Sequence, residues 1–149
     1  HINGMTLGAF TGYFRDRDSL KNITHPYNEY KAHVVLGVIY DYVSDIDERK
    51  SYTIEQLPDI ISVIKNFKFF VQEKWKIAID RPGSGNTKNI GSVSNINDLI
   101  NGNGPFAELG EDIFNDYWMY YLTTDMARMA ELPKPYYRNL SEYKQFKNI

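Results

Sequence analysis

The residues best suited to contact a ligand or a nucleic acid form one short segment, Gly83-Ser84-Gly85-Asn86-Thr87. Two glycines one residue apart let the backbone approach a partner closely, and Asn86 and Thr87 both donate and accept hydrogen bonds. The composition is equally typical of a plain connecting loop. A phosphate cradle is a third possibility and fits least well, because the G-x-x-x-x-G-K-[ST] spacing and a complete three-glycine pattern are missing. The residues alone leave these three interpretations open.

Asp80 is the carboxylate nearest to this segment. It ends Ile77-Ala78-Ile79-Asp80, which resembles the strand that presents a carboxylate in metal-dependent nucleases. An Asp-x-Lys pattern would require a lysine two positions later, where the chain has Pro82. The sequence therefore favours Asp80 as a residue at the start of the loop and not as a metal ligand.

The other acids and histidines also have structural explanations. Residues 45–48 supply close carboxylates that could bind a divalent ion, but Arg49 and Lys50 follow at once and favour a solvated helix end. Glu111 and Asp112 are expected at a helix N-terminus, where the helix dipole favours acids. The histidines at positions 25 and 33 are not at ligand spacing, so each is interpreted as a structural histidine whose polar atoms are satisfied.

Two polar clusters could contact phosphates. One is the basic stretch of Arg15, Arg17 and Lys21, and the other lies on a C-terminal helix and contains Thr123, Thr124 and Arg128. Charged and polar faces are usually only solvated, so the residues alone assign neither cluster a partner.

Composition limits the class of protein. The chain has 149 residues, 42% of them hydrophobic, which suits one domain over residues 1–149. It has no cysteine, so disulfides and thiolate metal sites are excluded and a reducing, cytoplasmic location is expected. No apolar run approaches the roughly 20 residues of a membrane span. The formal net charge of −2 argues against a strongly basic nucleic-acid-binding surface.

Hydrophobic spacing predicts an α/β fold, in which a mixed sheet is flanked by helices. We expect an extended segment over residues 5–14, a long helix over 25–45, an edge element over 51–63, a hairpin over 67–79, a short strand over 89–93, a helix over 109–132 and a short last helix that begins at Asn139 or Ser141.

Several blocks in a fixed order resemble the EcoRV-like type II restriction endonucleases, of the PD-(D/E)xK nuclease superfamily. The resemblance covers about residues 5–148 and includes the glycine-rich segment with its flanking strands. The blocks are Met5-Thr6-Leu7-Gly8, Lys21-Asn22-Ile23, Ala32-His33, Gln72-Glu73-Lys74-Trp75, Gly83-Ser84-Gly85-Asn86-Thr87, Asn89-Ile90-Gly91-Ser92, Asp116-Tyr117-Trp118 and Leu140-Ser141-Glu142-Tyr143.

The resemblance implies a homodimeric, Mg²⁺-dependent enzyme that cuts double-stranded DNA, leaving blunt ends at the centre of GATATC. It implies that Gly83, Ser84, Gly85, Asn86 and Thr87 read bases in the major groove. It places Lys21, Thr124 and Arg128 at the DNA backbone, and the segment from about residue 50 to 64 at the subunit interface.

The chain also departs from the family pattern. The family's two acidic metal ligands and its lysine lie upstream of the part that matches Met5, so no catalytic or metal-binding residue is assigned here. The expected fold is accordingly a restriction-endonuclease-like fold without its N-terminal catalytic elements, and the chain by itself is predicted not to cleave DNA. Tyr42 and Thr123 stand where the family carries basic residues. The alternatives are a non-catalytic DNA-binding or dimerisation module, and a small-ligand or phosphate-binding α/β domain.

Overall fold

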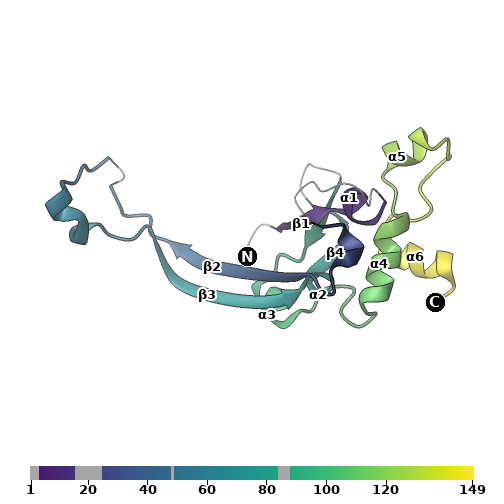
Figure 1. The fold of residues 1–149 in the computed structure, drawn as a ribbon, viewed down its shortest axis with the longest axis horizontal. Helices are drawn as coiled ribbons and strands as arrows, with labels where there is room; N and C mark the ends of the chain where they lie inside the picture. Colours follow the sequence, from purple (N-terminus) through teal and green to yellow (C-terminus); the bar gives the residue numbers. More distant parts are fainter. Residues whose placement is uncertain (1–3, 16–24, 48, 84–87) are drawn as a thin grey trace. The chain divides into compact units, whose positions relative to one another are not determined.

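The computed structural model describes residues 4–15, 25–47, 49–83 and 88–149 (Figure 1). The chain divides into two compact units: His1–Val35 with Gln72–Ile149 form unit 1, and Leu36–Val71 form unit 2. The expectation of one domain over the whole chain stays a prediction.

A three-stranded antiparallel sheet forms the centre of unit 1. Its order is β1 (Thr6–Ala9), β5 (Asn89–Ser92) and β4 (Ala78–Pro82), so β5 is the middle strand. Both pairings contain a register shift of the kind that bulges produce. The predicted strand at 89–93 is confirmed. Of the extended segment predicted over residues 5–14, only the first half forms a strand, β1, and the second half is helical.

Short helices complete unit 1. They are α1 (Phe10–Phe14), η1 (Tyr27–Glu29), α2 (Lys74–Ile77), α3 (Ile96–Asn101), α4 (Glu111–Tyr120), α5 (Thr124–Met129) and α6 (Leu140–Lys147) (Figure 1). The side chains of Asn95, Thr123 and Asn139 accept backbone N–H groups at the starts of α3, α5 and α6. Such caps satisfy donors that a helix leaves unpaired.

The core of unit 1 is mostly aromatic. The ring of Tyr117 lies 5.0 Å from that of Tyr137 and 5.3 Å from those of Trp118 and Tyr143. The buried hydroxyls find acceptors: Tyr137 donates to the carbonyl of Tyr117, and Tyr143 donates to Asp116. A high tyrosine content therefore serves a packed core whose polar ends are satisfied.

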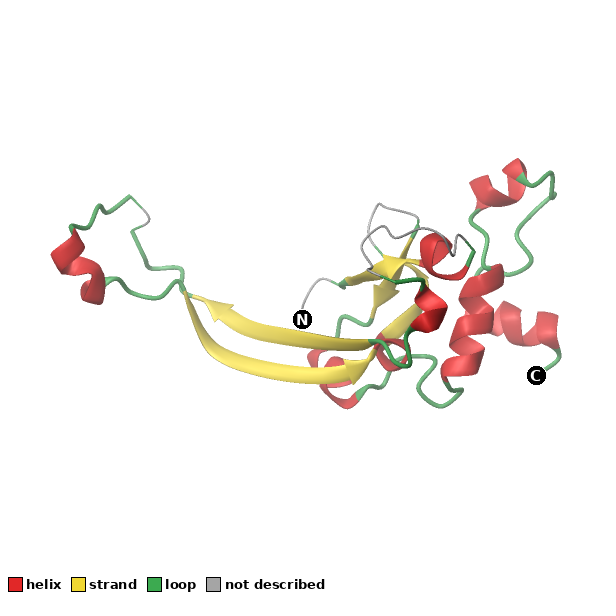
Figure 2. Ribbon diagram, in the orientation of Figure 1, coloured by secondary structure: helices red, strands yellow, loops and turns green. Residues whose placement is uncertain are grey.

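Unit 2 is a two-stranded ribbon with a loop at its end. It contains most of β2 (Val34–Tyr42) and β3 (Ile64–Glu73), whose arrows point in opposite directions (Figure 2), and the 3₁₀ helix η2 (Ile54–Asp59) in the loop between them. Within the ribbon, the ring of Phe70 lies against Gly37, where any side chain would collide with it.

The α/β class with helices around the sheet is confirmed, but several predicted elements differ from the structure. The predicted edge element over 51–63 is a loop that contains the 3₁₀ helix η2. The predicted helix over 25–45 is a 3₁₀ turn followed by β2. The predicted hairpin over 67–79 does not form, because β3 continues to Glu73, α2 follows, and β4 pairs with β5. None of the described helices is long and apolar enough to cross a membrane.

The predicted helix over 109–132 is two helices, α4 and α5. The backbone of Tyr121 is extended, and the Arg15 guanidinium donates hydrogen bonds to the carbonyls of Met119 and Tyr121. Arg15 thus supplies donors to carbonyls that the end of α4 leaves without helical partners.

Candidate functional site

The glycine-rich segment connects β4 to β5 along the chain, and these two strands pair in the unit 1 sheet. Of its five residues only Gly83 is among those described, and Ser84, Gly85, Asn86 and Thr87 lie outside them. Pro82 is paired with Ile90, and the amide of Gly83 donates to the carbonyl of Asn89 at 2.9 Å. The pairing of β4 with β5 therefore holds together the residues on either side of the segment.

Gly83 and Gly91 approach each other closely at this point. A Cβ atom on Gly83 would lie 2.6 Å from the Gly91 Cα atom, a distance that neither backbone can tolerate. The two glycines line a groove of about 520 Å³. Gly4 and Met5, which directly precede β1, and the exposed Arg81 also line it. Glycine is needed at position 83 for this backbone contact, whatever the segment binds.

Asp80 has a structural role that the sequence did not indicate. Its carboxylate accepts the amide of Leu140 at 2.9 Å, and its backbone carbonyl accepts the Tyr117 hydroxyl. Asp80 therefore connects β4, directly before the glycine-rich segment, to the first residue of α6 and to α4. The Asp80 carboxylate is thus used in a contact within the fold.

The polar cluster on α5 is partly available for contact. Thr124 and Arg128 are both exposed, whereas Thr123 caps the helix by accepting the amide of Met126. Arg128 forms an ion pair with Asp125 at 3.0 Å, and about four fifths of each side chain is exposed. An exposed pair of this kind is worth about 0–1 kcal/mol and exchanges readily for another anion.

Of the basic stretch of Arg15, Arg17 and Lys21, the structure describes Arg15 alone. Arg15 is half-buried and is committed to the end of α4, so it is not free to contact phosphates. Arg17 and Lys21 lie outside the described residues.

Within the described ranges, no group of three His, Cys, Asp or Glu side chains lies close enough to hold a metal ion. Asp45 and Asp47 are exposed in the loop after β2, not at a helix end as predicted, and Asp47 accepts the amide of Arg49. The described residues thus do not fit a Mg²⁺ site, and we assign no step of catalysis to a metal held by them.

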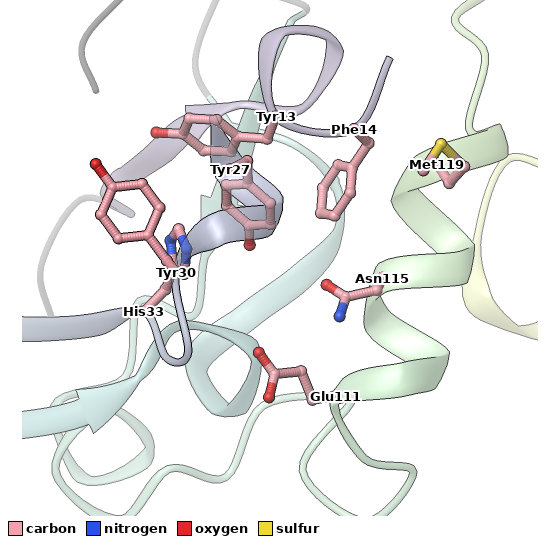
Figure 3. A pocket seen from close by; sticks show the side chains of 8 residues that line it. All are labelled: Tyr13, Phe14, Tyr27, Tyr30, His33, Glu111, Asn115 and Met119. Carbon is pink, nitrogen blue, oxygen red and sulfur yellow. The ribbon is translucent and has the colours of Figure 1, made fainter. Parts of the chain in front are cut away.

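A separate pocket of about 250 Å³ lies between α1, η1 and α4 (Figure 3). One wall is made of rings from the N-terminal part of unit 1: Tyr13, Phe14, Tyr27, Tyr30 and His33. The other wall is α4, from which Glu111, Asn115 and Met119 face the rings (Figure 3). Glu111 lies in the first turn of α4, as predicted from the sequence.

Lys74 contacts two rings of the aromatic wall and is only 6% exposed. Its ammonium nitrogen is 4.1 Å from the centre of the Tyr13 ring and 4.8 Å from that of Tyr27. Burial lowers the pKa of Lys74 to about 7, and the nearby Glu111 carboxylate opposes this shift. The sequence analysis missed this group, because an isolated lysine between Glu73 and Trp75 carries no pattern that predicts burial.

His33 is neutral at physiological pH. Burial, followed by the charge of Lys74, lowers its pKa to about 4, although a hydrogen bond to the backbone of Tyr27 acts in the opposite direction. The sequence predicted a structural histidine whose polar atoms are satisfied. In the described part of the chain, however, its Nε2 atom is buried without a hydrogen-bond partner, as is Oδ1 of Asn115.

Comparison with known proteins shows a match over nearly the whole chain. The family model described as "Restriction endonuclease EcoRV" matches residues 1–148. The chain is also 39% identical, over 143 residues, to a protein of Escherichia coli named "Type II restriction enzyme EcoRV". The alignment covers 95% of this chain and 55% of that relative, so the chain spans about half the relative's length.

Proposed function

Since the chain belongs to the EcoRV family of restriction endonucleases, we propose that it supplies the DNA-recognition part of a type II site-specific endodeoxyribonuclease that cuts double-stranded DNA. The observation that carries the proposal is the extent of the family match. It runs from residue 1 to residue 148 and so includes the glycine-rich segment and α5 together.

Gly83, Ser84, Gly85, Asn86 and Thr87 read the bases of the target, which we propose is GATATC, cut at its centre to leave blunt ends. In the major groove each base pair presents its own pattern of donors and acceptors. An asparagine amide matches adenine, a threonine methyl group matches that of thymine, and glycine backbone groups reach base edges without an intervening side chain. The pairing of β4 with β5 on either side of the segment supports this role.

Lys21, Thr124 and Arg128 contact the phosphate backbone. Such contacts position a protein on the duplex and carry no sequence information directly. The exposure of Thr124 and Arg128 on α5 supports the assignment, and the solvated Asp125 partner of Arg128 is cheaply replaced by a phosphate.

Cleavage requires Mg²⁺ and carboxylates that this chain is not proposed to supply. In a complete enzyme the ion would activate water and stabilise charge at the phosphate. The 149 residues alone are therefore expected to bind DNA without cutting it. Specific cutting by a preparation whose intact mass corresponds to these residues only would contradict that expectation.

The enzyme is proposed to act as a homodimer, joined through the segment from about residue 50 to 64. Apolar side chains are exposed throughout the segment: 81% of Ile54, 58% of Leu57 and 65% of Ile61. We expect Leu57→Asp to weaken self-association at least about tenfold, since an interface cannot solvate an unpaired charge.

Sedimentation equilibrium measures this effect, and Met129→Asp is the matched control because Met129 is 84% exposed but lies outside the segment. A monomeric wild-type chain, or an equal effect of the two substitutions, would contradict the dimer proposal.

The recognition proposal is tested by comparing Asn86→Ala with Arg128→Ala. Asn86→Ala should weaken binding to a GATATC duplex by about 1–3 kcal/mol and leave binding to a scrambled duplex nearly unchanged. Arg128→Ala should weaken both to a similar degree and lower the slope of log K against log salt by about one. Fluorescence anisotropy at several salt concentrations measures both quantities.

Arg138→Ala, which removes an exposed arginine outside the proposed contacts, serves as the control. Equal losses on both duplexes after Asn86→Ala would exclude Asn86 as a base reader. Binding that is insensitive to salt would favour the alternative of a small-ligand domain, because phosphate contacts are strongly salt-dependent.

A further inference from the structure

The pocket between α1, η1 and α4 presents hydrogen-bond acceptors and no cation on its lining. Glu111 contributes a half-buried carboxylate, which forms no ion pair with any of the described lysines, arginines or histidines. Asn115 contributes Oδ1, which is buried and reached by no donor from the described residues. An unmet buried acceptor costs free energy, so a donor that fits the pocket would be favoured.

His33 supplies a third acceptor. Because the imidazole is neutral near pH 7, only one ring nitrogen carries a proton. The ring N–H donates to the backbone of Tyr27. Among the described residues, the other ring nitrogen, Nε2, has no hydrogen-bond partner. Nε2 therefore carries a lone pair, and Figure 3 shows His33 across the pocket from α4.

The rest of the lining suits a small positive group with an apolar tail. Tyr13, Tyr27 and Tyr30 offer ring faces that attract cations, and Phe14 and Met119 offer apolar surface. The volume of about 250 Å³ lies just below the range of about 300–1,000 Å³ that holds drug-sized ligands, so the occupant is small.

From this arrangement we propose that the pocket binds the ammonium group of a small alkylamine, with Glu111, Asn115 and His33 accepting its three N–H donors. A primary ammonium has three donors and no acceptor, which matches a carboxylate, an amide oxygen and a bare imidazole nitrogen. The alkyl chain lies against the rings. No DNA is required, so the proposal stands apart from the recognition function.

Lys74 makes this binding dependent on pH. Its ammonium lies over Tyr13 and Tyr27, and Glu111 lies near enough to affect its pKa. A second cation in the pocket would repel it. Because burial already lowers the pKa of Lys74 to about 7, the lysine loses its proton at little cost.

Glu111 contributes to the same pH trend, because only its ionised carboxylate attracts an ammonium group. Burial raises the pKa of Glu111, and Glu73 and Asp112 add to this effect, while Lys74 opposes it. Ligand binding should therefore release a proton from Lys74, and the affinity should rise from about pH 6 to about pH 8.5.

The test is calorimetric titration of the DNA-free chain with n-butylammonium at pH 8, with butyrate as a probe of the same length and opposite charge. We expect saturable binding of n-butylammonium and none of butyrate. Glu111→Gln, which keeps the shape of the side chain, should weaken binding at least about tenfold, since hydrogen bonds to charged groups are the strong ones. Asp112→Asn, at the next and exposed position of α4, should change it by less than about twofold.

A second measurement does not depend on how the variants fold. The chain has three histidines, and the proton resonances of the His33 ring should shift during the n-butylammonium titration, with the same midpoint as the heat. Absence of saturable binding, equal or tighter binding of butyrate, or a Glu111→Gln chain that binds like wild type while retaining its circular dichroism spectrum would each overturn the proposal.

Discussion

Lys74 combines burial, ring contacts and a carboxylate neighbour in a way that makes it the most pH-sensitive cation of unit 1 among those described. Its ammonium is stabilised by the faces of Tyr13 and Tyr27, but these contacts do not replace the water it has lost. Burial is the largest cause of its low pKa. The protonated form is thus a cost to folding at and below neutral pH.

This cost predicts how stability changes with pH. The pKa of Lys74 falls from 10.5 to about 7 on folding, so between these values the unfolded chain binds more protons. The contribution of Lys74 to stability should therefore increase as pH rises from about 7 to about 10. In Lys74→Met this contribution is absent, so the wild-type minus variant difference in free energy of unfolding should grow by about 1.4 kcal/mol for each pH unit in the middle of that range.

Urea denaturation of both chains at a series of pH values measures the difference, and Lys76→Met is the control because Lys76 is more than a third exposed. A difference that stays constant from pH 7 to pH 10 would show that Lys74 is not a buried, depressed lysine.

Individual residues were predictable from the sequence where their role is local. A helix cap at Asn139 and the place of Glu111 in a first helical turn depend only on neighbouring positions; Glu111 was identified, and Asn139 was one of two candidates for the start of the last helix. The roles of Asp80, Arg15 and Lys74 depend on residues 37 to 106 positions away or on burial, which no local pattern encodes.

At the scale of elements, the start of α6 shows how the helix and the sheet are coupled. The Asn139 side chain accepts the amide of Glu142 at 2.9 Å, and its own amide group donates to the Glu142 carboxylate. The amide of Leu140 donates a hydrogen bond to the carboxylate of Asp80 on β4. The first turn of α6 thus depends on one cap of its own and one contact from the strand beside the glycine-rich segment.

Removing the cap should cost stability without changing the sheet. Asn139→Ala is expected to lower the free energy of unfolding by about 0.5–2 kcal/mol, because an N–H of the first turn loses its acceptor. Ser141→Ala, in the same turn but exposed, should stay within about 0.5 kcal/mol of wild type. Thermal unfolding followed by circular dichroism compares the two variants. Equal effects at the two positions would show that Asn139 does not stabilise α6 as its N-cap.

The misassigned element, β2, shows where periodicity fails. Its apolar residues at 34, 35, 38, 39 and 42 fit a helical repeat, but nearly every residue of Val34–Tyr42 is apolar, so the alternation of a strand fits as well. Val and Ile are β-branched, and Gly37 disfavours a helix, and both features favour a strand. Pairing with β3 decides the outcome, and that partner lies more than 20 residues away.

At the scale of the whole molecule, apolar surface is concentrated on unit 2. Exposed side chains include Leu36 at 69%, Phe69 at 65% and Val71 at 62%. Exposed apolar side chains gathered on one part of a chain are typical of an interaction surface.

The fold class and the family could both be predicted from the sequence, for different reasons. The class follows from helical and alternating patterns around a glycine-rich loop. The family follows from ordered blocks of residues, and the match over residues 1–148 confirms it. The base-reading and backbone-contacting residues stay predictions, since most of the loop and Lys21 lie outside the described chain.

The central claim is that this chain reads a DNA sequence. The most direct test is the wild-type chain's affinity for a GATATC duplex relative to a duplex of the same composition in scrambled order, at matched salt and without Mg²⁺. We predict a preference of at least about a thousandfold, the lower end of specific recognition. Equal affinity for the two duplexes at every salt concentration would contradict the account.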